Sequence, residues 1–442
     1  MKLIHVPFCF YPEPVGGTEV YVAALAHEQQ RNGDEVIVAA PGQTDQTYAN
    51  HGLAVRRFAV SPRVHDLREM YGAGSPDAAA GFARILDEER PDLVHLHALT
   101  RAVSLRLVRE VKRREIPVVF SYLTPTASCQ RGTLLRWGSE VCDGALDIHR
   151  CASCALHGQG LAKPASILAG SMPPGFGRIL GAAGASGGLW TALRMTELVA
   201  LRQAAFRDLM KEVDHIVALG EWVRGLLLLN GAPAAKLTVS RLGLCQYPVL
   251  APRRERPSSC LRVAFLGRLD PTKGVHVLIE ALRGIPKAAV HLDVFGVTQG
   301  KEGESHGHRL LRLASGDPRI AFRDPVQSDA VVSLLRDYDV LAVPSQWLET
   351  GPLVVLEAFA AGTPVIGSNL GGIAELVKHG VNGLLVDAAS PDHWAEALRR
   401  LSQDGNLVAK LRSGIRAPRT IKVTAAELMA VYRHVLQEVL VA

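Results

Sequence analysis

Short apolar runs rich in β-branched residues alternate with amphipathic stretches along this chain, in two successive series. In the first series the predicted strands are Leu3–Val6, Glu35–Ala39, Leu93–Leu96, Val118–Ser121, His215–Ala218 and Leu237–Ser240, with helices at 20–30, 78–89 and 102–113. In the second series they are Val263–Leu266, His291–Phe295, Val340–Val343 and Val365–Gly367. Such alternation indicates parallel βαβ units. The predicted fold class is therefore α/β, with two facing Rossmann-like domains and a ligand cleft between them, because ligands bind beyond the carboxyl ends of parallel strands.

The length of 442 residues also favours two domains, since it exceeds what one core usually serves. We expect an N-terminal domain at 1–247, interrupted by a Cys- and Gly-rich insertion at about 124–196 where the alternation fails. A Pro- and Arg-rich segment at 248–260 is the predicted linker. The second domain is expected at 261–415, and one amphipathic helix is predicted in the tail at 416–442.

The amino-acid composition and net charge limit which binding partners are expected. Hydrophobic residues make up 48% and charged residues 21%, and 49 basic minus 43 acidic side chains give a net charge of +6. No basic run with interleaved aromatic residues occurs, so a nucleic-acid partner is not expected. The N-terminus lacks the arrangement of a signal peptide, so a cytoplasmic location is the expectation.

The stretch at 165–190 is the nearest approach to a membrane span, but Pro173, Pro174 and Arg178 interrupt it. A flexible lid or a broken helical hairpin is the favoured interpretation of this stretch. Peripheral contact with the inner face of a membrane is the alternative.

The sequence WLETGPLVVLEAFAAGT at 347–363 carries two carboxylates, Glu349 and Glu357, around an expected helix start at Gly351-Pro352. Proline suits a first helical position because its missing N–H would have had no partner there. The free amides of Leu353 and Val354 then suit a phosphate. Two carboxylates flanking an anion site fit a ligand that is part diphosphate and part polyol, as a nucleotide sugar is.

Two further loops add to this pattern. Gly267-Arg268 ends a predicted strand and Lys273-Gly274 opens the next helix, so two cations can neutralise a diphosphate. Gly16-Gly17 follows the first strand, where glycines allow close approach of the backbone to a ligand. In isolation, the first loop would be a turn with two solvated cations, and the second a tight βα turn.

Together, the E-x7-E pattern, GRLDPTKG at 267–274, the stretch 364–386 and PVGGTEVYVAALA at 14–26 resemble retaining glycosyltransferases of family 4, also called glycosyl transferases group 1, with the GT-B fold. The resemblance implies that Arg268 and Lys273 hold the donor diphosphate, that Glu349 contacts the donor sugar, and that Glu357 binds the ribose hydroxyls. It further implies that the Gly16-Gly17 loop lies over the donor phosphate and the acceptor.

The resemblance implies a hexosyltransferase-like enzyme of the EC 2.4 class, in glycan, polysaccharide or glycolipid biosynthesis. Its donor would be a nucleoside diphosphate sugar and its acceptor a hydroxyl of a sugar, glycan or lipid-linked glycan. No cofactor is required for catalysis in such enzymes. The first domain would be the acceptor side, and the tail helix would return to it. The alternatives are a sugar-nucleotide-binding protein without transferase activity and a nucleotide-sugar epimerase.

His95 and His97 alternate on a predicted strand and so face one side, where they could bind a metal, although no third ligand is evident nearby. A buried structural histidine is the other interpretation. The resemblance makes His97 a site residue. Two positions depart from the family pattern: Leu123 stands where a histidine is usual, and Thr350 follows Glu349 where a glycine is common.

Four of the seven cysteines fall together, at Cys129, Cys142, Cys151 and Cys154. The last two have the C-x2-C spacing of zinc half-sites, and four thiolates would satisfy tetrahedral Zn²⁺. An insertion with little core of its own has reason to need such a ligand. The sequence therefore predicts a structural zinc, with free buried thiols as the alternative and His149 or His157 as substitute ligands.

Overall fold

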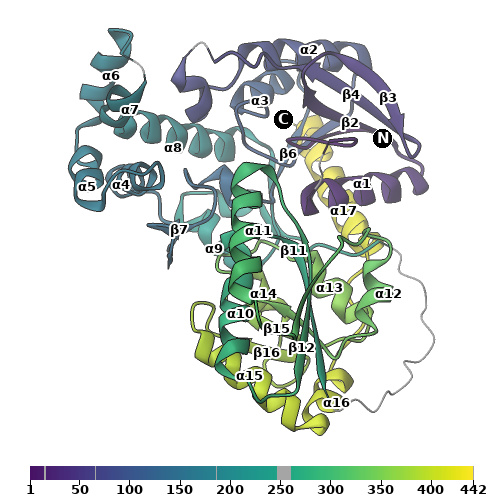
Figure 1. Ribbon diagram of the computed structural model, residues 1–442. Coiled ribbons are helices and arrows are strands. Elements are labelled where there is room, and N and C mark those ends of the chain that lie inside the picture. The colour runs from purple at the N-terminus through teal and green to yellow at the C-terminus, as the bar shows by residue number, and fades with distance from the viewer. Residues whose placement is uncertain (14–15, 65, 186, 246–259, 442) are drawn as a thin grey trace. The chain divides into compact units, whose positions relative to one another are not determined.

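The computed structural model describes residues 1–442 except 14–15, 65, 186, 246–259 and 442. The chain divides into two compact units, the first formed by Met1–Leu242 with Ile421–Ala442 and the second by Gly243–Thr420. Each unit is built on its own mainly parallel sheet (Figure 1). The predicted linker at 248–260 lies outside the described residues, apart from Cys260.

The sheet of unit 1 has eight strands. In order across the sheet they are β10 (Leu237–Val239), β9 (His215–Ala218), β6 (Val118–Tyr122), β5 (Leu93–Leu96), β1 (Lys2–Val6), β2 (Glu35–Gly42), β4 (Leu53–Ala59) and β3 (Gln46–Asn50). Neighbours pair in parallel except β3 with β4. All six predicted strands are present. The sequence did not reveal β4 because Arg56 and Arg57 interrupt its apolar pattern.

Helices complete the βαβ units of unit 1. They are α1 (Gly17–Arg31), α2 (Pro76–Glu89), α3 (Leu105–Lys112), α8 (Met195–Glu212) and α9 (Glu221–Leu229). The C-terminal helix α17 (Ile421–Val441) packs against α1. It is tied to the end of the first segment of the unit, since Ser240 Oγ donates to Glu427 Oε2 at 2.8 Å.

The Cys- and Gly-rich insertion is more regular than its sequence indicates. Besides the short hairpin β7 (Leu135–Arg136) and β8 (Glu140–Val141), it forms α4 (Ile148–Gly158), α5 (Lys163–Gly170), α6 (Pro174–Ala182) and α7 (Gly188–Leu193). A small core joins it to α8, made by Tyr71, Ala152, Ala155, Leu156, Met195, Leu198 and Val199. The stretch at 165–190 is thus a series of short helices broken at its prolines and glycines, in line with the broken hairpin predicted.

The sheet of unit 2 has six parallel strands. In order they are β13 (Ile320–Arg323), β12 (Val290–Val297), β11 (Leu261–Arg268), β14 (Val340–Val343), β15 (Val365–Ser368) and β16 (Gly383–Val386). Its helices are α10 (Val275–Gly284), α11 (Gly300–Ala314), α12 (Val331–Leu335), α13 (Leu353–Ala360), α14 (Gly371–Leu376), α15 (Pro391–Gln403) and α16 (Gly405–Ser413). The strand order reverses between β11 and β14, which is the order of a doubly wound Rossmann sheet.

Two hydrophobic cores cover the faces of this sheet. One contains Trp394 of α15 with residues of α10, and the other contains Val355 and Phe359 of α13 with residues of α12. Both faces of a parallel sheet must be covered because its strands are apolar on both sides. Among the described residues, no helix is long and apolar enough to cross a membrane.

Candidate functional site

The strongest candidate site of unit 2 lies where its strand order reverses. Strands β11 and β14 are hydrogen-bonded neighbours there, with Val263 opposite Val340. Their connections leave in opposite directions, which opens a space beyond their carboxyl ends where open α/β sheets bind ligands. Gly267 and Arg268 end one strand, Lys273 follows it, and Glu349 follows the other strand. The predicted residues therefore come together at this switch point.

The loop after β11 is a tight turn held against the loop after β14. Asp270 accepts a hydrogen bond from the amide of Thr272 at 2.9 Å, which starts the 3-10 turn Pro271–Lys273. Gly274 follows with φ of 72°, and a Cβ placed there would lie 1.8 Å from the carbonyl oxygen of Pro344. Only glycine allows this approach. The amide of Gln346 donates to Thr272 O at 2.7 Å, which closes the contact.

Glu349 is the centre of a buried polar cluster. Its side-chain Oε1 accepts from Lys273 Nζ at 2.6 Å, from Ser345 Oγ at 2.8 Å and from Trp347 Nε1 at 2.8 Å. Lys273 Nζ also lies 5.4 Å from the centroid of the Trp347 ring, a cation–π distance. All three of these hydrogen bonds go to the same carboxylate oxygen.

The backbone of Glu349 is fixed by the glycine pair that begins α14. The amide of Gly372 donates to Glu349 O at 2.7 Å. A Cβ at Gly371, where φ is 47°, would lie 2.9 Å from the same oxygen. The glycines of the GGIAEL stretch thus serve to bring the start of one helix onto the Glu349 loop.

The Glu349 carboxyl stays ionised. Burial alone would raise its pKa, but the charge and hydrogen bond of Lys273, with the Ser345 and Trp347 donors, hold the pKa below its ordinary value. An ionised carboxylate accepts hydrogen bonds and stabilises nearby positive charge. It has no proton to give as a general acid.

Glu357 has the opposite electrostatics. It lies in the second turn of α13, partly buried, and burial raises its pKa to about 7. Its carboxyl is thus poised between the neutral and the ionised form near physiological pH. A pair of hydroxyl donors would favour the ionised form.

The start of α13 differs by one position from the prediction. Pro352 is the N-cap residue, with φ of −72° and ψ of 104°, and the helix begins at Leu353. The amide of Val355 donates to Pro352 O at 3.1 Å. The amides of Leu353 and Val354 precede this bond, in the first turn at the positive end of the helix. Gly351 comes directly before the cap.

Arg268 is the more accessible cation of the site. It is the last residue of β11, after Gly267, and its side chain is 43% exposed. Its Nη2 lies 3.5 Å from Asp270 Oδ2. This long contact leaves most of the guanidinium fork open to an anion.

In unit 1 the predicted glycine loop precedes α1. Gly16 is the N-cap and Gly17 the first helical residue, and the buried Glu19 side chain accepts from the Gly16 amide at 2.7 Å. Residues 14 and 15 of this motif lie outside the described part of the chain.

Arg57, which was not predicted from the sequence, fixes the backbone shortly before the glycine loop. Its side chain is 4% exposed, and its Nη2 donates to Phe10 O at 2.7 Å and to Tyr11 O at 3.1 Å. An arginine in the middle of a strand is the signal that could have revealed it.

A third potential metal ligand lies beside His95 and His97, contrary to the expectation that none is nearby. His5 of β1 pairs in register with His95 of β5, and His5, His95 and His97 place ring nitrogens within 4.8 Å of one another. No other such group of three potential metal ligands occurs among the described residues. The sequence did not reveal this contact, because it depends on β1 and β5 being neighbours in the sheet.

Hydrogen bonds explain this histidine cluster without a metal. His5 Nε2 lies 2.7 Å from Gln29 Oε1, which can only accept, so His5 Nδ1 accepts from His97 Nε2 at 2.8 Å. His95 Nδ1 lies 2.6 Å from Tyr432 OH and its Nε2 2.8 Å from Ser121 Oγ.

These bonds occupy every ring nitrogen except His97 Nδ1, which is buried without a partner. Burial lowers the pKa of His5 to about 4 and the pKa values of His95 and His97 well below their ordinary values. The cluster is therefore neutral, and only His97 offers a free acceptor.

The four predicted zinc ligands, Cys129, Cys142, Cys151 and Cys154, line one cavity of the insertion. Their sulfurs do not form a group within 4.8 Å, unlike the histidines. Two of them accept backbone hydrogen bonds: Cys142 Sγ from Gly144 N at 3.5 Å, and Cys154 Sγ from Trp137 N at 3.3 Å.

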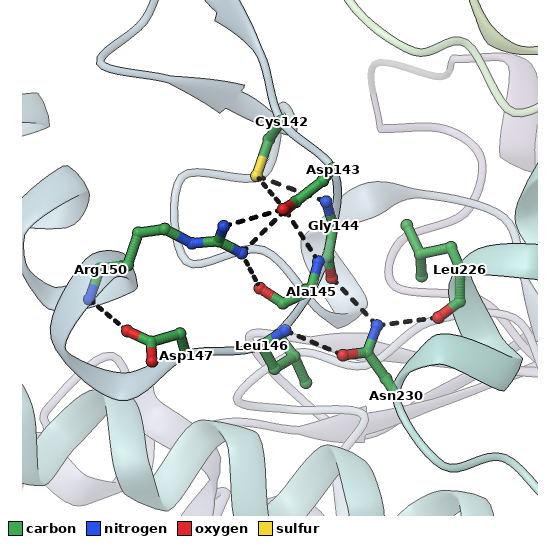
Figure 2. A network of polar contacts seen from close by, with 9 residues as sticks. All are labelled: Cys142, Asp143, Gly144, Ala145, Leu146, Asp147, Arg150, Leu226 and Asn230. Carbon is green, nitrogen blue, oxygen red and sulfur yellow. Dashed lines mark hydrogen bonds and ion pairs between the residues drawn. The ribbon is translucent and has the colours of Figure 1, made fainter.

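Polar contacts fix the loop between Cys142 and α4 (Figure 2). Arg150 binds both oxygens of Asp143, at 2.8 Å each, and Asp147 caps α4 by accepting from Arg150 N. Asn230, after α9, accepts from Leu146 N at 2.9 Å and donates to Gly144 O at 3.0 Å. The cysteines on the two sides of this loop are therefore held in a defined relation.

Comparison with known protein families shows to which family the chain belongs. The family described as Glycosyl transferase 4-like domain matches residues 16–243, and the family described as Glycosyl transferases group 1 matches residues 253–417. The chain belongs to the group 1, family 4-like glycosyltransferases. The resemblance predicted from the sequence is thereby confirmed.

Relatives of this family share part of the chain. The D-inositol 3-phosphate glycosyltransferase of Corynebacterium glutamicum is 36% identical over 184 residues, which are 39% of this chain and 43% of that protein. The chain thus spans less than half the length of this relative. Proteins of the same name from Corynebacterium efficiens and Rhodococcus jostii are matched over 34% of their length each.

Solved structures share the whole fold. The sucrose-phosphate synthase of Thermosynechococcus elongatus superposes with a TM-score of 0.68 at 17% identity, covering 99% of this chain and 100% of the other. Anabaena HepE in complex with UDP-glucose has a TM-score of 0.59 at 17% identity, with 100% of both chains covered. These likenesses confirm the predicted fold class of two Rossmann-like domains.

Leu123 departs from the family pattern in its sequence and also in its environment. Leu123, where a histidine was expected, is 7% exposed and directly follows β6. An apolar side chain at this buried position cannot exchange a proton with a ligand.

Proposed function

We propose that this protein is a retaining glycosyltransferase that moves a sugar from a nucleoside diphosphate sugar to an acceptor hydroxyl. The observation that carries the proposal is the Lys273–Glu349 pair, at the ends of the two strands that flank the switch point of unit 2. A cation that binds phosphate and a carboxylate that binds a polyol are there in direct contact. A nucleotide sugar presents both groups within one ligand.

The roles in donor binding follow from charge and exposure. Arg268 and Lys273 neutralise the diphosphate, together with the amides of Leu353 and Val354. The Glu349 carboxylate accepts from a sugar hydroxyl. Glu357 accepts from the ribose hydroxyls, which requires its ionised form.

In the proposed reaction, the bond between the anomeric carbon and the phosphate oxygen breaks, and a bond from that carbon to the acceptor oxygen forms on the same face. The leaving diphosphate takes the acceptor proton, so no protein base is needed. Electrostatic stabilisation of the departing diphosphate by Arg268 and Lys273 supplies the main catalytic effect. Glu349, fixed by three donors, stabilises positive charge on the sugar.

Gly16 and Gly17 of unit 1 are assigned to donor binding, in a loop over the donor phosphate and the acceptor, and His97 is assigned to catalysis, next to the acceptor or the donor sugar. Family resemblance supports this assignment, and the free Nδ1 of His97 supplies a hydrogen-bond acceptor. HepE complexes with UDP and UDP-glucose support a nucleotide-sugar donor. The names of the Corynebacterium and Rhodococcus relatives make a polyol phosphate the first acceptor class to test.

The test is a screen of UDP-, GDP- and ADP-sugars by thermal shift, followed by product analysis with the donor that binds. Arg268→Ala should weaken binding of that donor at least about tenfold, because a charge-assisted contact is lost. The control is Arg262→Ala at the other end of the same strand, where the guanidinium lies over the Tyr338 ring.

Two results would contradict the proposal. Equal loss of affinity in Arg268→Ala and Arg262→Ala would remove the donor site from the switch point. Tight donor binding with neither transfer nor hydrolysis would favour the sugar-nucleotide-binding protein instead. The anomeric configuration of the product, read by NMR, tests retention.

We also propose that Cys129, Cys142, Cys151 and Cys154 bind a structural zinc. Support comes from their shared cavity, from the N–H···S bonds to Cys142 and Cys154, and from the Arg150–Asp143 contacts that fix the loop. The sulfurs do not form a group within 4.8 Å, so binding of one ion requires them to move closer together. Elemental analysis should find about one zinc per chain.

Two double variants distinguish the loss of a zinc site from the mere loss of two thiols. Cys142→Ser with Cys151→Ser should lose the metal and lower the thermal midpoint. Cys9→Ser with Cys260→Ser, which lie outside the insertion, should retain both. Metal-free purified protein with an unchanged midpoint under chelation would refute the site.

A further inference from the structure

The outer surface of α5, α6 and α7 exposes large apolar side chains. Those exposed are Ile167 (47%), Leu168 (75%), Phe176 (39%), Ile179 (69%), Leu189 (71%) and Trp190 (47%). We call these six side chains the apolar face of the insertion. All three helices belong to one compact part of unit 1, and Figure 1 shows them gathered at one end of it.

The buried side of α5 and α6 carries small residues. Ser166 and Gly170, one turn apart, are the buried residues of α5, and Gly177 is the buried residue of α6. A Cβ at Gly170 would lie 2.1 Å from Ser153 Oγ, and one at Gly177 would lie 2.8 Å from Glu197 Cβ. Close packing therefore uses the small side, and the large apolar side is directed to the surroundings. A helix of a soluble protein normally has the reverse arrangement.

The charge of this region is of one sign. No aspartate or glutamate occurs between Asp147 and Glu197. Arg150 and Arg194 in this interval are paired with Asp143 and Glu197 respectively. The exposed cations next to the apolar face are Lys163 of α5 and Arg178 of α6, and Lys163 Nζ lies 5.0 Å from the Trp137 ring centroid.

We propose that the apolar face of the insertion docks on the surface of an anionic lipid bilayer. Leucine, isoleucine, phenylalanine and tryptophan side chains with flanking basic residues are the composition of interfacial helices that lie in the headgroup region. Exposed apolar side chains on short helices can enter this region without a complementary groove. The absence of acidic residues removes repulsion from anionic headgroups.

The inference does not depend on the proposed transfer reaction. It concerns where the protein is held, and its test needs neither donor nor acceptor. Failure of vesicle binding and failure of sugar transfer are therefore separate outcomes.

The test is flotation of the full-length protein with vesicles of phosphatidylcholine alone or with about 30% phosphatidylglycerol. Wild-type protein should float with the anionic vesicles, and less at high salt. The triple variant Leu168→Ser, Ile179→Ser, Leu189→Ser should reduce the bound fraction at least about tenfold, because three membrane-inserting side chains are lost. Its thermal midpoint should stay near that of the wild type, since these side chains are exposed.

The matched control replaces three exposed apolar residues elsewhere, Leu229 (58% exposed), Leu311 (50%) and Val381 (47%), by serine. This control variant should bind vesicles as the wild type does. Lys163→Gln with Arg178→Gln should weaken binding to anionic vesicles and leave the weak binding to neutral ones unchanged. Quenching of Trp190 fluorescence by brominated lipid should disappear in Trp190→Phe.

Three results would overturn the proposal. Wild-type protein that stays with the unbound fraction shows that the face does not bind lipid. Equal binding by the triple variant and its control removes this face as the contact. Self-association without vesicles that the triple variant abolishes would identify a second copy of the chain as the occupant.

Discussion

The two units both bury a cluster of titratable side chains beside the switch point of a sheet, but in opposite charge states. In unit 2, Glu349 is ionised and bound to Lys273 at 2.6 Å. In unit 1, His5, His95 and His97 are neutral and satisfied mainly by one another and by uncharged side chains. The same topology thus supports two different electrostatic environments.

The difference follows from the available partners. A buried charge is tolerated only with an opposite charge and hydrogen-bond donors around it, which the loops after β11 and β14 supply. The histidines meet no carboxylate, so burial removes their protons instead. A charged cluster suits a diphosphate sugar, and a neutral cluster suits an uncharged hydroxyl.

Removing the cation of unit 2 should have the largest effect. Lys273→Ala leaves the Glu349 carboxylate buried and unpaired, so we expect a loss of about 3 kcal/mol in the free energy of unfolding. Transfer should fall at least about a hundredfold because the diphosphate loses a counter-charge. Denaturant unfolding and initial rates measure the two effects.

A more exposed ion pair provides the control for this change. Lys112 Nζ lies 2.8 Å from Asp214 Oδ1, with side chains 37% and 20% exposed. Lys112→Ala should cost less than about 1 kcal/mol, since solvent screens such pairs. The double variant Lys273→Ala, Glu349→Gln should regain part of the stability lost by Lys273→Ala. Equal losses for the two lysines would contradict the burial argument.

Acid should act on unit 1 through its histidines. The folded-state pKa of His5, about 4, lies below the ordinary value of 6.5, so the unfolded chain binds protons that the folded chain does not. Stability from this group is present above pH 6.5 and is lost as pH falls toward 4, by about 2–3 kcal/mol. Urea unfolding at pH 7 and pH 5 in wild type and His5→Gln should show a shallower pH dependence in the variant. An unchanged slope in His5→Gln would mean that the cluster is not neutral in the folded protein.

The smallest expected effect concerns Glu357, the partly buried carboxyl of α13. Its pKa of about 7 lies above the ordinary 4.5, so the folded state keeps a proton that the unfolded state loses. Stability therefore falls as pH rises from 4.5 to 7, and the cost is fully present above pH 7. At pH 8, Glu357→Gln should be more stable than the wild type by about 1–2 kcal/mol.

The affinity for the donor should change with pH in the opposite direction to the stability. Affinity of the wild type for an intact nucleotide sugar should rise between pH 6 and pH 8 as the carboxyl ionises, and Glu357→Gln should show no such rise. Isothermal titration at several pH values would measure it. A gain of both stability and donor affinity in the variant would contradict the ribose role.

Much of the proposed donor site could be predicted because its residues are local. Gly267, Arg268 and Lys273 lie at the end of β11 and in the turn after it, and Glu349 to Glu357 span the loop after β14 and the start of α13, so strand ends and helix starts place them. The ion pair between Lys273 and Glu349 could not be predicted, because it depends on β11 and β14 being neighbours. The same holds for the contact of His5 with His95, which lies far away in sequence, and for the contacts of Arg57 with a loop more than forty residues earlier.

The sequence by itself determined the fold class, the family and the candidate ligands, because strand periodicity, glycine turns and charged loop residues are properties of short segments. Only the tertiary structure decided which carboxyl is ionised, which histidine keeps a free nitrogen and which side of α5–α7 is outward. Those properties depend on burial and on partners supplied by distant segments. Local sequence thus indicates which side chains can take part in binding, and tertiary packing determines whether each of them is charged.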